Sequence, residues 1–242
     1  MFYQETQPEG VLATYIDAYW VASSTENKTT EEKILPDGCV DIILNAGTDC
    51  RVESENFVMK QNKMYVVGAM TKYKVTLMHR TTRLMGVRFK PGAFSLFSKN
   101  CPLYGLRDQT IELEDAWLHG IKKLKFSPKD LNHFFNGKLD NNLPPVLNIV
   151  QDIQQQRGNA RITELAEKHY HTTRQIERLF KKHVGISPKE LSNITRYREA
   201  LNIIQQRSNL PLQDIANICG YHDHSHLSKD IKRYTGSHPS LL

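Results

Sequence analysis

The chain has 242 residues, which is enough for two ordinary domains, each with its own hydrophobic core. Its hydrophobic content of 39% and charged content of 24% are typical of a globular protein. No apolar run approaches the roughly 20 residues that cross a bilayer, and the N-terminus lacks the basic and apolar regions of a signal peptide. We therefore expect a cytoplasmic protein with no membrane partner.

The basic excess is concentrated toward the C-terminus. The formal net charge is +6, and residues 145–242 contain 14 Lys and Arg against 9 Asp and Glu. A basic surface of this kind favours a polyanionic partner such as nucleic acid. The cysteines form no Cys-x-x-Cys pair, which predicts buried, reduced thiols rather than a zinc ribbon or a disulfide framework. They are Cys39, Cys50, Cys101 and Cys219.

Residues 1–90 are predicted to be rich in β-strands. Short apolar stretches with aromatic and β-branched residues alternate with turn signals such as Pro36-Asp37-Gly38 and Asn45-Ala46-Gly47. The predicted strands lie within residues 12–22, 39–44, 64–67, 75–78 and 84–89. Many short strands at this spacing favour a sandwich or a small barrel.

Short helices are expected after Pro91-Gly92, over residues 93–98, 112–124 and 129–136, the last of them started by Ser127-Pro128. Residues 137–145 are polar, contain Gly and Pro and lack apolar periodicity, so they predict a linker. The predicted fold class is α+β. It has an N-terminal β-rich effector or dimerisation domain over residues 1–136 and an all-α domain over residues 146–242.

The C-terminal domain contains two helix-turn-helix patterns, over residues 162–183 and 211–234. In each pattern a small residue on the first helix, Ala166 or Ala216, permits close packing of the second helix. A long helix over residues 188–206 joins the two units, and its start is marked by Ser187-Pro188. A paired module of this kind can place two recognition helices in successive major grooves of DNA.

The outward positions of the two recognition helices carry side chains suited to DNA. Arg binds guanine in a bidentate way, Glu accepts from cytosine, and Ser, Thr and Lys reach phosphates. We expect base contacts from Arg174, Glu177, Arg178, His224, His226 and Lys229. We expect backbone contacts from Thr172, Thr173, Lys181, Ser225, Lys232 and Arg233. A solvated helix face without any DNA contact is the alternative for each single residue.

These motifs resemble those of the AraC/XylS family of transcriptional regulators. The resemblance covers about residues 146–240, and the stretches that carry it include Leu165-Ala166, Arg178-Leu179-Phe180-Lys181, Gly185-Ile186-Ser187-Pro188, Arg196-Tyr197-Arg198-Glu199-Ala200, Gly220-Tyr221 and Tyr234-Thr235-Gly236. The chain departs from the family at Tyr221, Leu227 and Ile231, where Phe is usual. The resemblance implies a sequence-specific DNA-binding regulator that binds promoter DNA and contacts RNA polymerase.

The N-terminal half is similar to the sensor-like domain of one subgroup of that family. The similarity is carried by Tyr19-Trp20, Leu35-Pro36-Asp37-Gly38-Cys39 and Gly86-Val87-Arg88-Phe89. It implies a cupin-like β-barrel that binds an effector, pairs two chains into a homodimer, or both. The candidate effector pocket consists of Tyr15, Tyr19, Trp20 and Arg88. The alternative for its aromatic residues is ordinary barrel core.

No catalytic, metal or cofactor site is expected. The N-terminal histidines His79, His119 and His133 form no His-x-His pair, and the i, i+2 spacing of residues 222, 224 and 226 does not converge on one helix face. We therefore expect no enzyme, and the main hypothesis is a DNA-binding regulator modulated by a small-molecule effector. The alternative is a ligand-independent regulator whose N-terminal domain serves dimerisation or protein contact.

Overall fold

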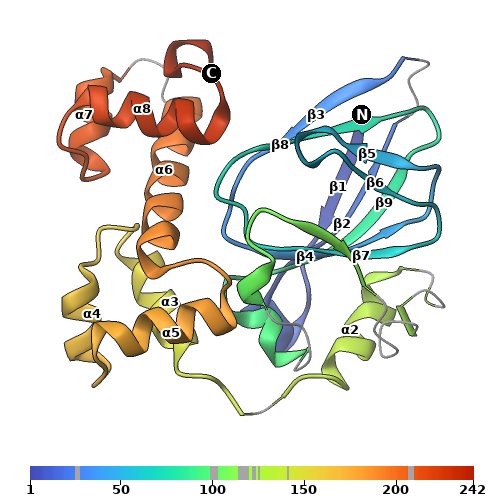
Figure 1. Ribbon diagram of the computed structural model, residues 1–242, viewed down its shortest axis with the longest axis horizontal. Coiled ribbons are helices and arrows are strands. Elements are labelled where there is room, and N and C mark those ends of the chain that lie inside the picture. The colour runs from blue at the N-terminus through green and yellow to red at the C-terminus, as the bar shows by residue number, and fades with distance from the viewer. Residues whose placement is uncertain are drawn as a thin grey trace.

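The computed structural model describes residues 1–24, 28–98, 103–113, 120–121, 124, 126–140, 142–206 and 210–242 (Figure 1). Antiparallel sheets form the N-terminal half and helices form the C-terminal half, which confirms the predicted fold class. Within this described part of the chain, no helix is both long enough and apolar enough to span a membrane.

The larger sheet has six strands in the order β1-β2-β9-β4-β7-β10. Its strands are β1 (Phe2–Thr6), β2 (Ile16–Ser23), β4 (Val40–Asn45), β7 (Met64–Val67), β9 (Arg83–Phe89) and β10 (Thr110–Glu112). Strands β2 and β9 pair with Trp20 opposite Gly86. A Cβ atom at Gly86 would lie 2.1 Å from the Trp20 ring, so the absence of a side chain allows the indole to pack against β9.

The smaller sheet has four strands in the order β3-β8-β5-β6. Its strands are β3 (Thr30–Ile34), β5 (Cys50–Val52), β6 (Phe57–Met59) and β8 (Lys74–Met78). An apolar cluster joins the two sheets and contains Trp20, Ile43, Met59, Met78 and Leu84. Residues from both sheets therefore enclose one interior, as expected for a barrel-like domain.

The opposite face of the larger sheet is covered by α2 (Pro128–Asn136) and by the short 3-10 helices η1 (Gly10–Thr14), η3 (Ala93–Leu96) and η4 (Leu103–Gly105). The Phe89 ring on β9 packs against Phe94, Phe97 and Phe135, with ring centroids 5.2–5.5 Å apart. Helix α2 begins as predicted, because the Ser127 hydroxyl accepts from the Asp130 amide.

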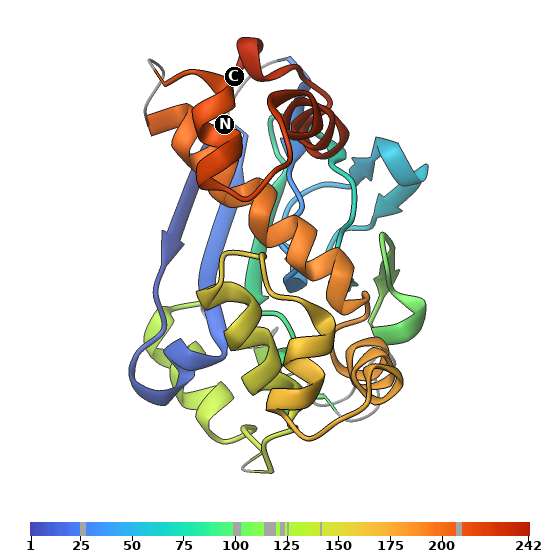
Figure 2. The same ribbon diagram turned by 90° about the vertical axis from the view of Figure 1, so that its left-hand side faces the viewer.

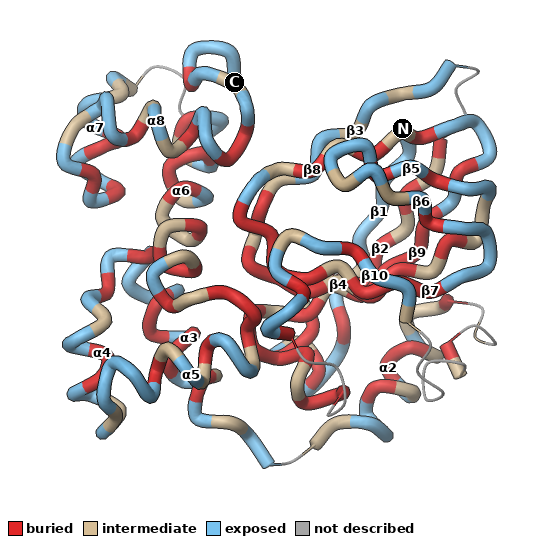
Figure 3. The backbone as a smooth tube through the Cα atoms, viewed as in Figure 1, coloured by how far each residue is buried: buried red, intermediate tan, exposed pale blue. Residues whose placement is uncertain are grey.

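The C-terminal half consists of helices around one core. They are α3 (Val146–Gln155), α4 (Ile162–Lys168), α5 (Thr173–His183), α6 (Pro188–Gln206), α7 (Leu212–Ile218), α8 (His224–Thr235) and the 3-10 turn η6 (Pro239–Leu241). Helix α6 joins the α3–α5 group to the α7–α8 group (Figures 1 and 2). Buried residues recur along its length (Figure 3), among them Leu191, Ile194, Tyr197 and Ala200. The core of this half therefore includes residues from both helix-turn-helix units.

Three predicted elements differ from the structure. The strand predicted from residue 12 begins at Ile16, since Gly10–Thr14 forms a 3-10 turn. The segment 93–98 is a 3-10 helix that ends at Leu96. The helix predicted from Glu112 is wrong at its start, because the Glu112 backbone pairs with Tyr65 of β7 and this sheet pairing overrides the local helical pattern. The rest of that helix lies largely outside the described residues, as do His119 and Cys101.

The position of the linker stays a prediction. Helix α2 ends at Asn136 and α3 begins at Val146, which is compatible with a linker over residues 137–145.

The two halves contact each other at several points. At α5, His183 shares a hydrogen bond with Ser95, 3.1 Å between Nδ1 and Oγ. At α6, the Tyr197 hydroxyl donates to the Pro36 carbonyl oxygen. At the end of α8, the Lys33 ammonium donates to the Thr235 carbonyl oxygen at 3.0 Å. The N-terminal, sheet-rich half, which we call the β-domain, therefore contacts both recognition helices, α5 and α8, and also α6, which joins them.

Candidate nucleic-acid interface

Helix α5 is built to expose one basic face. Thr172 and Gln175 form a reciprocal capping box that starts the helix. Ile176 and Phe180 are fully buried against the domain core. Residues on the opposite side are exposed, among them Arg174, Arg178 and Lys181, whereas Glu177 is half-buried. The sequence prediction of a buried and a polar face on this helix is confirmed.

Helix α8 also has one buried apolar face and one exposed basic face, but a different residue caps its N-terminus. The Asp223 carboxylate accepts from the His226 amide at 2.7 Å, and Gly236 ends the helix in a left-handed conformation. Leu227 and Ile231 are fully buried. The remaining predicted contact residues of this helix are exposed, namely His224, Ser225, His226, Lys229, Lys232 and Arg233.

The buried positions align the two recognition helices. Counted from the caps Thr172 and Asp223, Ile176 corresponds to Leu227 and Phe180 to Ile231. The exposed pairs that follow are Arg174 with Ser225, Arg178 with Lys229, and Lys181 with Lys232. Arg178 and Lys229 therefore occupy equivalent positions on the two helices, as do Lys181 and Lys232. By the same alignment Ser225 takes the place of a predicted base-contacting arginine, although it was predicted to contact the backbone.

Some predicted DNA contacts already have partners within the chain. The Thr172 hydroxyl accepts from the Gln175 amide in the capping box. The His224 ring lies 3.1 Å from the Gln213 side-chain oxygen. The His226 ring packs edge-on against Tyr221 with centroids 5.1 Å apart. Arg174, Arg178 and Lys229 are exposed, and no contact within the described residues holds their side chains. DNA contact by each of these residues stays a prediction.

The two recognition helices lie on the same side of the domain. Figure 1 shows α5 and α8 running across the view at opposite ends of α6, and Figure 2 shows both nearly end-on. Their axes are therefore roughly parallel. Two parallel helices at opposite ends of a connecting helix can enter successive major grooves on one side of a duplex.

The structure separates the four residues of the predicted effector pocket. A cavity of about 310 Å³ lies between the two sheets, and Trp20 and Arg88 line it. Tyr19 faces the other side of β2, where its hydroxyl donates to Asn132 of α2 at 2.9 Å. Tyr15 lines a different pocket, beside Leu147 of α3. Neighbouring residues of a strand point to opposite faces, so Tyr19 and Trp20 cannot line one cavity. Of the four predicted residues, only Trp20 and Arg88 therefore line this cavity, so the predicted grouping is wrong for Tyr15 and Tyr19; effector binding stays a prediction.

A charged network at the rim of this cavity was not predicted. The Arg88 guanidinium lies 2.8 Å from Glu5, 3.4 Å from Asp37 and 3.6 Å from Asp41. The Trp20 indole N–H also donates to Asp41, at 2.7 Å. Burial raises the pKa of Asp41 to about 7, against the opposing effect of Arg88. Arg88 thus lies close to three carboxylates, of which Glu5 is far in the sequence from the neighbouring pair Asp37 and Asp41.

The raised pKa of Asp41 predicts a pH-dependent stability. A carboxyl whose pKa is higher in the folded protein binds its proton more tightly in the folded than in the unfolded state. The stabilisation that protonated Asp41 gives the folded protein is therefore fully present below pH 4 and is lost as the pH rises toward 7. Asp41→Asn keeps an acceptor for Trp20 and removes this titration. We expect the variant to lose less stability than the wild type between pH 5 and pH 8 in urea unfolding. Parallel pH profiles for the two proteins would contradict this assignment.

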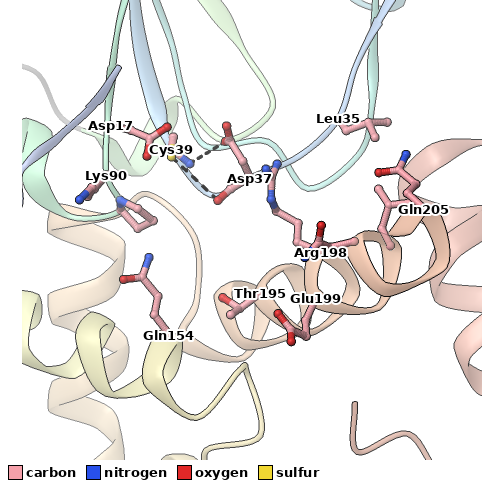
Figure 4. A pocket seen from close by; sticks show the side chains of 13 residues that line it. Asp17, Leu35, Asp37, Cys39, Lys90, Gln154, Thr195, Arg198, Glu199 and Gln205 are labelled. Atoms are coloured by element: carbon pink, nitrogen blue, oxygen red, sulfur yellow. Dashed lines mark hydrogen bonds between the residues drawn. The ribbon is translucent and has the colours of Figure 1, made fainter. Parts of the chain in front are cut away.

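A second, polar cleft of about 630 Å³ lies between the β-domain and the helices (Figure 4). Its walls include Asp37 and Lys90 from the β-domain, Gln154 from α3, and Arg198 and Glu199 from α6. Arg198 projects from α6 toward the Asp37 loop (Figure 4) and also lines the cavity between the sheets. Arg198 therefore lines both the polar cleft and the cavity between the sheets, and it belongs to α6, the helix that joins the two helix-turn-helix units.

No cluster of three or more metal-ligating side chains occurs among the described residues. Cys39, Cys50 and Cys219 are free and buried, and burial raises the pKa of each thiol. Raised thiol pKa values are typical of structural rather than reactive cysteines.

Comparison with known proteins adds two family matches and a curated relative. Residues 165–242 match a helix-turn-helix domain family, and residues 4–112 match a domain family of unknown function, DUF6597. The raffinose operon transcriptional regulatory protein RafR of Pediococcus pentosaceus is 42% identical over 62 residues. The chain carries an AraC-type helix-turn-helix domain. The RafR match spans 26% of this chain and only 22% of RafR, whose name describes a regulator rather than an enzyme.

Beyond the AraC-type domain, the likeness extends to the whole fold. ToxT from Vibrio cholerae has a TM-score of 0.50 at 12% identity, and the match covers 100% of this chain and 97% of ToxT. A crystal structure of an apo ToxT variant also has a TM-score of 0.50, at 13% identity and 98% coverage of both chains. At these identities the likeness concerns the arrangement of a β-domain in front of the AraC-type domain.

Proposed function

We propose that this chain is a transcription regulator that binds specific promoter DNA with α5 and α8 in adjacent major grooves. The observation that carries the proposal is the parallel placement of two capped, outwardly basic helices at opposite ends of α6. The match of residues 165–242 to a helix-turn-helix domain supports it. Such a protein acts in the cytoplasm, where it contacts RNA polymerase or a second copy of itself.

The exposed side chains divide into two proposed roles. Arg174, Glu177 and Arg178 contact bases in one half-site, and His224, His226 and Lys229 contact bases in the other. Residues with hydroxyl or ammonium groups nearby contact the phosphate backbone. These are Thr172, Thr173, Lys181, Ser225 and Lys232, together with Arg233 and its guanidinium.

Selection of genomic fragments by the purified full-length chain, at a stated salt concentration, tests this function. We expect an enriched asymmetric site with two short blocks about one helical turn apart. Enrichment by residues 145–242 but not by the full chain would show that the β-domain inhibits binding until an effector arrives. Absence of enrichment with both proteins would contradict sequence-specific binding.

We further propose that the cavity between the sheets binds an apolar small-molecule effector. Its wall contains Trp20, Ile43 and Met78, and at its rim Lys33 and Arg198 connect it to the DNA-binding half. Lys33 bonds the carbonyl oxygen of Thr235 at the end of α8. A ligand that moves Lys33 would therefore change the support of one recognition helix.

A fluorescent probe tests the effector site. In a Trp117→Phe background, Trp20 is the only tryptophan, and we expect energy transfer from it to bound 8-anilino-1-naphthalenesulfonate. Ala22 is buried and lines the cavity, so Ala22→Phe fills the space and should abolish transfer while DNA binding persists. Transfer that survives this substitution would place the probe elsewhere. Absence of transfer in both proteins would favour the ligand-independent alternative.

A further inference from the structure

The turn between α4 and α5 has a glycine-type backbone without a glycine. The His171 amide donates to the Ala166 carbonyl oxygen at 2.9 Å, and the Tyr170 amide donates to the Glu167 carbonyl oxygen at 3.2 Å. This is the Schellman arrangement, which ends a helix with one left-handed residue. Tyr170 is that residue, with φ of 55°. Glycine is favoured there because a side chain crowds the backbone in the left-handed conformation.

The turn between α7 and α8 has the same backbone with the expected residue. The Tyr221 amide donates to the Ala216 carbonyl oxygen at 2.9 Å, and the Gly220 amide donates to the Asn217 carbonyl oxygen at 3.3 Å. Gly220 has φ of 73°. The chain thus contains a matched pair of turns, one with glycine and one with tyrosine at the left-handed position.

Packing within the protein does not account for Tyr170. Its side chain is 96% exposed, and its hydroxyl has no hydrogen-bond partner among the residues that the structure describes. Among all the residues that the structure describes, the other non-glycine residues with positive φ are polar, charged or buried. They are Asn56, Asn62, Asp108, Arg157 and Phe126. A strained residue without internal contacts suggests a partner outside the fold.

We infer that Tyr170 contacts the DNA backbone, with its hydroxyl donating to a phosphate oxygen beside the half-site of α5. This inference rests on the proposed DNA-binding function. Tyr170 precedes by two residues the cap Thr172, where the recognition helix begins. A recognition helix inserts its N-terminal residues into the groove, so the preceding turn lies beside the phosphates. Tyrosine hydroxyls are among the groups that position proteins on phosphates.

The second unit lacks the equivalent contact, because Gly220 has no side chain. A Cβ atom there would lie 2.3 Å from the Asn159 side-chain oxygen, so a side chain at this position would require Asn159 to move. The protein therefore makes one more phosphate contact at the α5 half-site than at the α8 half-site.

Two substitutions test this inference on the full-length protein with the selected operator. Tyr170→Phe removes the hydroxyl alone, and Tyr170→Gly also removes the backbone strain. We expect both to raise Kd by about fivefold to tenfold. The slope of log Kd against log salt should not change, since the phenol carries no charge. Tyr170→Gly should also raise the melting temperature by about 2–4 °C.

The inference and the proposed function fail separately. Wild-type affinity in both variants, together with weakened binding by Arg178→Ala, would overturn the tyrosine contact and leave DNA binding intact. A lower melting temperature for Tyr170→Gly would show that the tyrosine serves the fold, which also overturns it. Unchanged DNA affinity with reduced transcription by purified polymerase would assign Tyr170 to a protein partner instead.

Discussion

Replacing Arg178 with alanine is expected to weaken specific DNA binding by about 1–3 kcal/mol, which is about fivefold to 150-fold in Kd. Arg178 is exposed on the outward face of α5, in the place that Lys229 occupies on α8. A guanidinium at this place can bind guanine through two hydrogen bonds, and alanine leaves both acceptors without a donor. The loss should therefore be greatest at one base pair of the operator.

Binding titrations with the operator and with single-base variants measure this effect. Lys232→Ala provides the contrast, because loss of a phosphate contact should weaken binding to all sequences and reduce the salt slope by about one. Arg51→Ala provides the control, since Arg51 is an exposed residue of β5 in the β-domain. Equal, sequence-independent losses for Arg178→Ala and Lys232→Ala would contradict the base-contact assignment.

Replacing Arg88 with methionine is expected to lower the free energy of unfolding by about 3–5 kcal/mol at pH 7. Arg88 is the cation that Glu5, Asp37 and Asp41 share, and the Asp41 side chain is only 17% exposed. Methionine fills similar space but leaves these carboxylates close together without a positive charge. Their desolvation and mutual repulsion then oppose folding.

Urea unfolding of Arg88→Met and of Arg51→Met distinguishes a partly buried network from a surface ion pair. Arg51 pairs with Glu53 at 2.9 Å, and both side chains are about half exposed, so we expect a change within 1 kcal/mol. The loss in Arg88→Met should be smaller at pH 5, where the Asp41 carboxyl, whose pKa is raised, is protonated. Equal losses for the two variants would contradict the network's role in folding.

The helices of the DNA-binding half could be predicted closely because their ends are coded locally. Thr172 and Gln175 cap α5 within four residues, and Ser187 with Pro188 starts α6. Helix α6 begins and ends at the predicted residues, and α5 ends where the first predicted helix-turn-helix pattern ends, at residue 183. The strand β1 was missed because its residues are mostly exposed, and only pairing with β2 makes it a strand. Local pattern therefore predicts structure well where the stabilising contacts are themselves local.

The candidate sites follow the same rule. The exposed faces of α5 and α8 were predictable from apolar spacing, and the structure confirms which residues face outward. The network around Arg88 was not predictable, because Glu5, Arg88 and the stretch from Asp37 to Asp41 come from three segments that meet only in the folded barrel. The separation of Tyr19 from Trp20 was within reach of the sequence, since adjacent strand residues alternate between faces.

The continuity of α6 has a consequence for the DNA itself. A helix of 19 residues is about 28 Å long and stiff, whereas one turn of duplex is about 34 Å. The protein cannot adjust its spacing freely, because removing one residue from α6 would also rotate the second unit by about 100°. If α5 and α8 enter adjacent major grooves as proposed, we expect the duplex to bend or twist so that both half-sites are in contact. We then expect base pairs between the half-sites to affect affinity through how easily they deform.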